Sequence, residues 1–149
     1  TYLGTLARGV KPEQLLLEPP APRLEYFKTY GRIDICLDPF PYPGGTTTAE
    51  ALWMGVPVLT LDGNTFLSKQ GAGILSAVGL EQWIAKDRGD YLSRAIEFAS
   101  DVDELVRVRA GLRQMALASP LFDAPRFARH FEDALWSMWS AQRTKVVAN

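Results

Sequence analysis

The sequence contains one cysteine, one histidine and no long apolar run, and these shortages exclude several kinds of protein. Cys36 has no partner in the chain, which excludes an intramolecular disulfide and a zinc site built from cysteines. We therefore expect a reducing, cytoplasmic setting. No apolar stretch reaches the roughly 18 residues of a membrane-spanning helix, and the first residues do not show the order of a secretory signal, so no membrane is expected as a partner.

The sequence also lacks an excess of charge of either sign, because 16 Lys and Arg residues nearly balance 17 Asp and Glu residues. No uniform field is available to hold a nucleic-acid backbone, so nucleic acid is not expected as a partner either. The 149 residues are 47% hydrophobic and 22% charged, which is ordinary for a folded globular protein. We expect one domain at residues 1–140, followed by a polar tail at 141–149 that frays.

Strand and helix patterns alternate along much of the chain, which is typical of a parallel α/β sheet. Strands are predicted at residues 15–17, 33–37, 57–61 and 83–85. Helices are predicted at the N-terminal residues 1–9 and then at 23–30, 46–54, 66–78, 91–99, 102–118 and 125–139. The expected fold class is therefore α/β, a Rossmann-like parallel sheet with C-terminal helices.

A loop rich in proline and glycine follows the second predicted strand, at the end of a parallel strand where α/β sheets bind ligands. Gly44 and Gly45 let the backbone approach a phosphate, and the first N–H groups of the next helix would point at it. Thr46 and Thr47 add hydroxyl donors. Glu50 lies one turn further on the same face, where it would repel phosphate but accept hydrogen bonds from a ribose diol. The pattern suggests a nucleoside diphosphate, and a capped helix after a turn is an equal alternative.

The stretch from Asp34 to Leu61, DICLDPFPYPGGTTTAEALWMGVPVLTL, closely resembles the donor-site segment of the protein O-GlcNAc transferase family, particularly its bacterial members. Residues 119–123 and the helix that ends at Met138 and Trp139 look like the C-terminal segment of that family. The resemblance covers nearly the whole chain. It implies the GT-B fold, in which two Rossmann-like domains face each other, the C-terminal one holds a UDP-sugar, and no metal or other cofactor is required.

By this resemblance, Thr46 and Thr47 hold the diphosphate together with the helix N-terminus, and Glu50 stands where the family places an acidic residue on the ribose. Gly44 belongs to the same segment. Gly45 departs from the histidine of animal members, so any role of that imidazole is absent here.

Residues 20–23 look like the uracil-facing loop of the family. The Ala21 backbone is the candidate for pairing with the base edge, and Arg23 is the candidate replacement of a lysine. Tyr26 falls where animal members have a histidine near the donor, so its ring would stack or its hydroxyl would bond phosphate. Half-buried packing is the commoner role of a tyrosine on a helix.

Four other polar or aromatic residues are interpreted as structural, and no catalytic residue is assigned. His130 is expected to pack within the last helix. Lys69 follows a strand end and would reach a phosphate, but a solvated lysine is the commoner case. Trp136 and Trp139 have the helical spacing of packing residues rather than of a sugar platform.

The resemblance implies that this is the C-terminal domain of a GT-B glycosyltransferase, truncated at its N-terminus, inactive alone and completed by a missing N-terminal half. The expected donor is UDP-GlcNAc, and the expected acceptor is a protein or peptide whose serine or threonine hydroxyl receives the sugar with inversion. Two alternatives stay open. One is an N-glucosyltransferase that uses UDP-glucose and an asparagine acceptor, and the other is a non-catalytic UDP-sugar-binding or interaction module.

Overall fold

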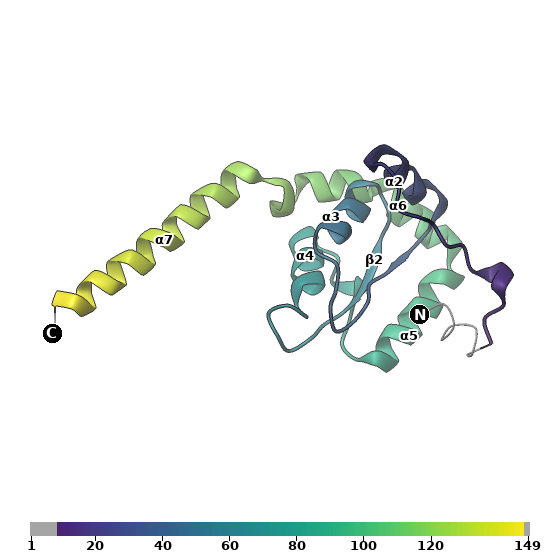
Figure 1. Ribbon diagram of the computed structural model, residues 1–149, viewed down its shortest axis with the longest axis horizontal. Coiled ribbons are helices and arrows are strands. Elements are labelled where there is room, and N and C mark those ends of the chain that lie inside the picture. Colours follow the sequence, from purple (N-terminus) through teal and green to yellow (C-terminus); the bar gives the residue numbers. More distant parts are fainter. Residues whose placement is uncertain (1–8, 148–149) are drawn as a thin grey trace.

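A computed structural model describes residues 9–147, with side chains as far as residue 143. The helix predicted before Gly9 therefore lies outside the described residues. Figure 1 shows two parts, a body of helices around a small sheet and a long helix that leads away from it. Within the described residues, none of the helices has both the length and the apolar character that crossing a bilayer requires.

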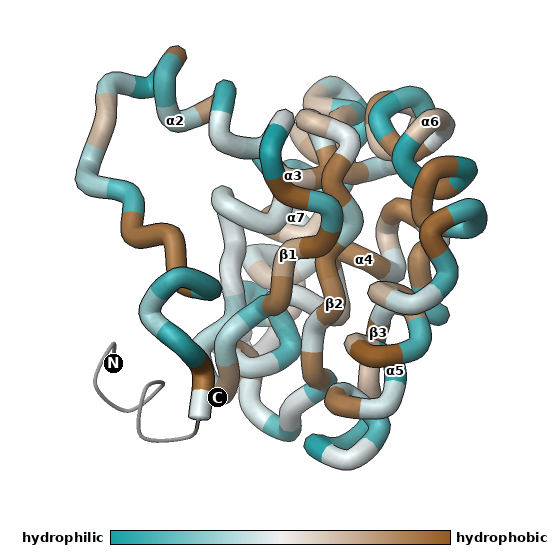
Figure 2. The backbone as a smooth tube through the Cα atoms, turned by 90° about the vertical axis from the view of Figure 1, so that its right-hand side faces the viewer, coloured by the Kyte–Doolittle hydropathy of each residue, from teal (hydrophilic) through white to brown (hydrophobic). Residues whose placement is uncertain are grey.

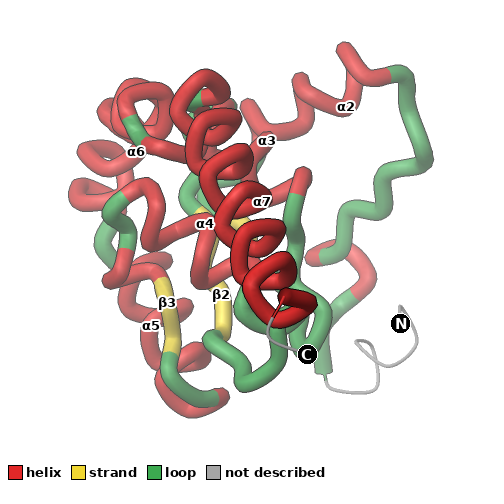
Figure 3. The backbone as a smooth tube through the Cα atoms, turned by 90° about the vertical axis from the view of Figure 1, so that its left-hand side faces the viewer, coloured by secondary structure: helices red, strands yellow, loops and turns green. Residues whose placement is uncertain are grey.

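The centre of the body is a three-stranded parallel sheet in the order β1, β2, β3, visible in part in Figure 3. Strand β1 (Cys36–Leu37) pairs with β2 (Val58–Leu61), and β2 pairs with β3 (Ile84–Ala85). The first three residues of β2 are buried, as expected for a central strand that is covered on both faces. The α/β class and the parallel sheet are confirmed.

Six α-helices and four short 3-10 helices surround or follow the sheet in the described residues. The α-helices are α2 (Arg23–Thr29), α3 (Thr46–Trp53), α4 (Gln70–Val78), α5 (Arg88–Ser100), α6 (Val102–Ala118) and α7 (Ala124–Val147). The 3-10 helices are η1 (Pro12–Gln14), η2 (Tyr30–Arg32), η3 (Glu81–Trp83) and η4 (Pro120–Phe122).

The ends of several helices follow directly from single residues. Gly55 and Gly79 adopt positive φ values of 75° and 80° just after α3 and α4, a conformation that glycine adopts without steric cost. Asp87 and Asp101 cap α5 and α6 by accepting backbone N–H groups of the first turn. The helix predicted at 66–78 begins only at Gln70, because Ser68 bonds locally to Thr65 instead.

The core lies between the central strand and the helices packed on it, and apolar segments run through this region in Figure 2. Its largest fully buried apolar side chains are Leu52 on α3, Leu59 on β2, Leu75 on α4, Leu80 just before η3, and Leu112 on α6. Contacts of α3, α4 and α5 with β2, and of α3 with α6, hold the layers together. The core therefore fixes the position of α3, which carries the predicted site.

The strand predicted at residues 15–17 does not form. Leu16 and Leu17 are 75% and 68% exposed, and the segment lies apart from the sheet in Figures 2 and 3. An apolar run becomes a strand only when a neighbouring strand offers hydrogen bonds, and among the described strands β1 pairs with β2 alone. The strand predicted at 33–37 is also shorter, since only Cys36 and Leu37 pair.

Helix α7 extends beyond the predicted end at Trp139 and continues through Val147. The prediction that Trp136 and Trp139 are packing residues is wrong for this chain, because 68% and 57% of their surfaces are exposed. His130 is exposed as well, so it does not have the packing role that we expected. The reason is the course of α7, which leads away from the body after η4, so that most of its length does not pack against the other described elements (Figure 1).

Candidate functional site

The candidate site lies where the loop after β1 enters α3, at the carboxyl end of the sheet. The first backbone hydrogen bond of the helix runs from the Ala49 N–H to the Gly45 carbonyl, so the three preceding threonine N–H groups lie outside the helical ladder. Gly45 is the N-cap residue, and no described side chain caps the helix. Thr46 and Thr47 are exposed, whereas Thr48 is buried. The start of α3 thus offers backbone donors, two accessible hydroxyls and the positive end of the helix dipole.

Asp38 lies beneath this loop and was not singled out from the sequence. Its carboxylate accepts hydrogen bonds from the Gly44 N–H at 2.6 Å and from the Thr60 hydroxyl at 2.7 Å, and only 6% of the residue is exposed. Burial raises the pKa of Asp38, while these two hydrogen bonds act in the opposite direction. One available signal was an acidic residue directly between a predicted strand and a loop of prolines and glycines.

Tyr91 on α5 holds the same residue from the other side. Its hydroxyl donates to the backbone carbonyl of Asp38 at 3.0 Å. Burial, and secondarily the charge of Asp38, raise the pKa of Tyr91 to about 12, so this hydroxyl keeps its proton and remains a donor at neutral pH.

Two glycines permit close packing around Asp38. A Cβ on Gly44 would lie 2.5 Å from Thr47 Oγ1 and 2.6 Å from Thr48 Oγ1. A Cβ on Gly71 of α4 would lie 2.6 Å from an oxygen of the Asp38 carboxylate. Side chains at these positions are therefore excluded without movement of the neighbours.

A side chain at Gly45 would meet less steric hindrance than one at Gly44. A Cβ there would approach the Gln70 side-chain oxygen at 3.2 Å, so the start of α4 stands beside the start of α3. Gln70 is exposed and was also missed from the sequence.

The structure brings two predicted site residues, Arg23 and Glu50, into contact. An Arg23 guanidinium nitrogen lies 3.3 Å from a Glu50 carboxylate oxygen, across the gap between α2 and α3. The Arg23 side chain is 76% exposed and the Glu50 side chain only 16%. Both border a pocket of about 390 Å³, which is lined by Arg23, Phe27, Thr46, Ala49, Glu50, Trp53 and Phe122.

Tyr26 faces inward from α2. Its hydroxyl lies 2.6 Å from that of Tyr30, and the Tyr30 hydroxyl donates to the backbone carbonyl of Thr47 at 3.5 Å. Burial raises the pKa of Tyr30, with the hydrogen bond to Tyr26 as a further cause. The two tyrosines thus link α2 to the first turn of α3, and a direct contact of Tyr26 with a donor stays a prediction.

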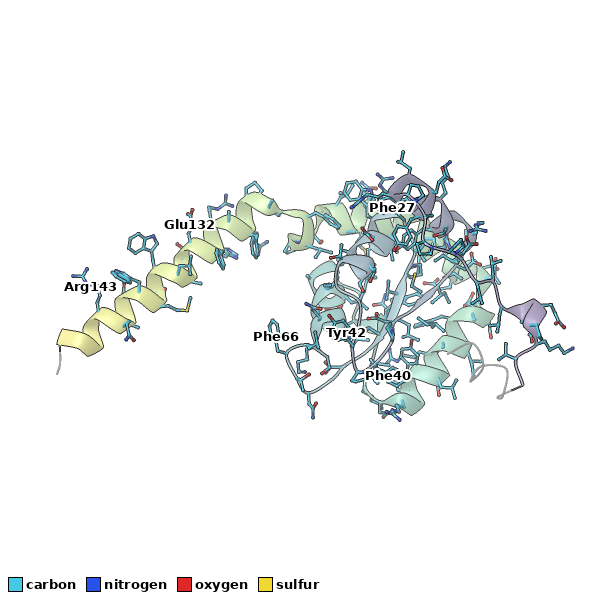
Figure 4. The ribbon with its side chains drawn as sticks, in the orientation of Figure 1. Phe27, Phe40, Tyr42, Phe66, Glu132 and Arg143 are labelled. Carbon is cyan, nitrogen blue, oxygen red and sulfur yellow. The ribbon has the colours of Figure 1, made fainter. Side chains whose placement is uncertain are left out.

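Ala21 and Lys69 lie at the margins of the site. Ala21 is exposed and lines a separate hollow of about 620 Å³ on another side of α2. Lys69 forms an exposed ion pair with Asp62 at 3.2 Å. The loops that follow β1 and β2 also carry Tyr42 and Phe66, labelled in Figure 4, which are 67% and 91% exposed.

Comparison with known proteins adds a family to this geometry. The sequence matches the family described as Glycosyl transferase family 41 over residues 3–131. It is 41% identical over 135 residues to a tomato (Solanum lycopersicum) protein named probable UDP-N-acetylglucosamine–peptide N-acetylglucosaminyltransferase SPINDLY, an alignment covering 85% of this chain and 14% of that protein. It is 31% identical over 132 residues to the UDP-N-acetylglucosamine–peptide N-acetylglucosaminyltransferase of Caenorhabditis elegans, covering 89% of this chain and 12% of that protein.

The fold is similar to that of a solved O-GlcNAc transferase from Thermobaculum terrenum. The TM-score is 0.84 at 37% sequence identity, and the match covers 90% of this chain and 26% of the solved chain. The chain therefore spans a small part of the length of the proteins that it matches.

Proposed function

The chain belongs to glycosyl transferase family 41, and we propose that it supplies the nucleotide-sugar site of a glycosyltransferase. The observation that carries the proposal is the start of α3, which has no side-chain cap and is approached by a loop without side chains at Gly44 and Gly45. A diphosphate placed there meets backbone N–H groups, the hydroxyls of Thr46 and Thr47 and the helix dipole. The first candidate donor is UDP-N-acetylglucosamine, as the names of the relatives suggest.

The ribose is assigned to Glu50. This carboxylate is mostly buried and lines, with Thr46, the pocket between α2 and α3. Its partner Arg23 is exposed, so the arginine side chain can move away when a ribose enters. A diol donates two hydrogen bonds to a carboxylate, which accounts for an acidic side chain so close to a site for anions. The base is assigned to Arg23, which borders the same pocket, and to the backbone of Ala21, two residues before it.

In the whole protein, a serine or threonine hydroxyl of a protein acceptor attacks the anomeric carbon while the bond from that carbon to the UDP oxygen breaks, so the configuration inverts. The donors at the start of α3 stabilise the negative charge that develops on UDP. The hydroxyl proton passes to a base that is not assigned to any residue of this chain. We propose that this charge stabilisation operates without a metal ion, so EDTA should leave transfer intact.

The remainder of the parent protein is proposed to complete the site. Among the described strands, β1 pairs on one side only, and the apolar residues of α7 are exposed. Unpaired edges and apolar helix faces are covered in stable proteins. The chain also spans only 14% of the tomato relative. A reducing, cytoplasmic setting stays part of this proposal.

Isothermal titration of the whole protein with UDP and with uridine tests the diphosphate assignment. Thr47→Val removes one hydroxyl donor, so UDP binding should weaken by about 1–3 kcal/mol while uridine binding changes little. Ser100→Ala, which removes a hydroxyl near the end of α5, is the control and should change neither.

Equal losses for both ligands would place Thr47 away from the phosphates. A titration with GDP in parallel tests the base, and tighter binding of GDP than of UDP would refute the uridine assignment. Transfer from UDP-glucose rather than UDP-N-acetylglucosamine, with a peptide that lacks serine and threonine, would favour the N-glucosyltransferase alternative.

A further inference from the structure

We propose that Asp38 is the positioning residue of the donor loop: its carboxylate fixes the Gly44 peptide and thereby the direction in which the start of α3 presents its N–H groups. The inference rests on the proposed function for its ligand, a nucleoside diphosphate. Asp38 itself lies under the loop and is not assigned any contact with that ligand.

The first argument is the geometry of the carboxylate. One oxygen accepts the Gly44 N–H at 2.6 Å and the other accepts the Thr60 hydroxyl at 2.7 Å. Gly44 directly precedes Gly45, the N-cap of α3, so the orientation of its peptide sets the entry of the chain into the helix. Because the Gly44 N–H is held inward, the donors left for a ligand are those of the first helical turn.

The second argument is that Asp38 is anchored to three elements of the body. Thr60 on β2 is fully buried, and Gly71 on α4 allows the carboxylate to approach where a Cβ would collide with it at 2.6 Å. Tyr91 on α5 holds the backbone carbonyl of Asp38 at 3.0 Å. One residue thus connects a loop of prolines and glycines, through both its side chain and its backbone, to β2, α4 and α5.

The third argument concerns charge. A carboxylate that is 6% exposed loses most of its hydration, so burying it is costly unless its hydrogen bonds compensate. Bonds to an ionised acceptor are about twice as strong as neutral ones, and a stronger bond holds the loop in one conformation before the ligand arrives.

The experiment measures the binding of UDP and uridine by isothermal titration of the whole protein, and the Gly44 amide resonance by NMR of the ¹⁵N-labelled protein, in the wild type and two variants. Asp38→Asn keeps the shape and one neutral acceptor, and Asp38→Ala removes both bonds. The Gly44 amide proton should resonate downfield in the wild type, move upfield in Asp38→Asn and move further in Asp38→Ala. Asp38→Asn should weaken UDP roughly five- to tenfold, Asp38→Ala more, and neither should change uridine beyond about twofold.

Ser119→Ala is the matched control, because Ser119 is a comparably buried polar residue whose hydroxyl bonds to the backbone of Ala116 in α6 and of Leu121 in η4. It should lower stability without changing the ratio of UDP to uridine affinities. If Asp38→Ala does not fold, Asp38→Asn alone decides the outcome.

A folded Asp38→Asn with wild-type UDP affinity overturns the proposal, and so does a Gly44 amide that resonates in the random-coil range in the wild type. If the whole protein fails to bind UDP while the Gly44 resonance responds to Asp38 as expected, the proposed function fails, and the anchoring of the loop stands.

Discussion

Gly71 and Gly73 lie two residues apart in α4, and the structure predicts opposite effects for the same substitution by alanine. A Cβ on Gly71 would lie 2.3 Å from Thr60 Oγ1 and 2.6 Å from an Asp38 oxygen, whereas a Cβ on Gly73 would meet nothing within 4 Å. Gly71 is buried and faces the sheet, and Gly73 is exposed. Each position therefore serves as the control for the other.

The expected magnitudes follow from two opposing effects. Alanine is more stable than glycine inside a helix by about 0.5–1 kcal/mol, so Gly73→Ala should raise the free energy of unfolding by that amount. At Gly71 the same gain is opposed by overpacking, which typically costs about 1–3 kcal/mol. Both atoms in the way belong to buried side chains held by their hydrogen bond, so neither can rotate aside. Gly71→Ala should therefore lose about 1–2 kcal/mol net.

Urea unfolding followed by circular dichroism measures both changes, provided that the dependence on urea concentration stays the same in all variants. A second readout is specific to the site, since Gly71→Ala should shift the Gly44 amide resonance through Asp38 and Gly73→Ala should not. A Gly71→Ala variant as stable as Gly73→Ala would refute the close contact of α4 with the Asp38 and Thr60 pair.

Three further predictions concern single side chains. Burial raises the pKa of Cys36, so less thiolate is present at any given pH, and alkylation should be slower in the folded chain than in urea. Glu50→Gln should weaken UDP by roughly 1–3 kcal/mol and 2′-deoxy-UDP far less, and a cycle between residue and hydroxyl that shows no coupling would refute the ribose assignment. Iodide should quench the fluorescence of Trp136 and Trp139 in this chain but not that of Trp83, which is 3% exposed, and equal protection of all three would contradict the course of α7.

The elements that the sequence predicts well are those whose ends are marked locally. Gly55 and Gly79 end α3 and α4 through positive φ values, and Asp101 starts α6 through a side-chain cap. In each case the residue type at the helix end is the physical cause of that end, so the sequence alone indicates it. The start of α3 at Thr46 agrees with the prediction for the same kind of reason, because the loop of prolines and glycines before it cannot continue either a strand or a helix. The position of the loop before α3 also follows, because a parallel strand must end at the edge where the next helix begins.

The features that the sequence does not predict depend on distant partners. Leu16 and Leu17 have the composition of a strand but no described neighbour, and Trp139 has the spacing of a packing residue but no surface to cover. Asp38 shows the opposite case. Its role depends on Thr60, 22 residues away, and on the missing side chain of Gly71, so its local position between strand and loop does not show which groups it binds.

The pair of Arg23 and Glu50, 27 residues apart, bears on how a ribose would enter. The carboxylate that we assign to the diol already has a cationic partner at 3.3 Å, so the hydroxyls must join or replace it. Ion pairs with an exposed partner contribute about 0–1 kcal/mol, and the Arg23 side chain is 76% exposed, so its displacement costs little. The Glu50 side chain is the more buried of the two, so it loses less conformational entropy than an exposed side chain would when it binds the ribose. The arginine is then free to turn toward the base or the phosphates, in agreement with the role beside the base that we propose for it.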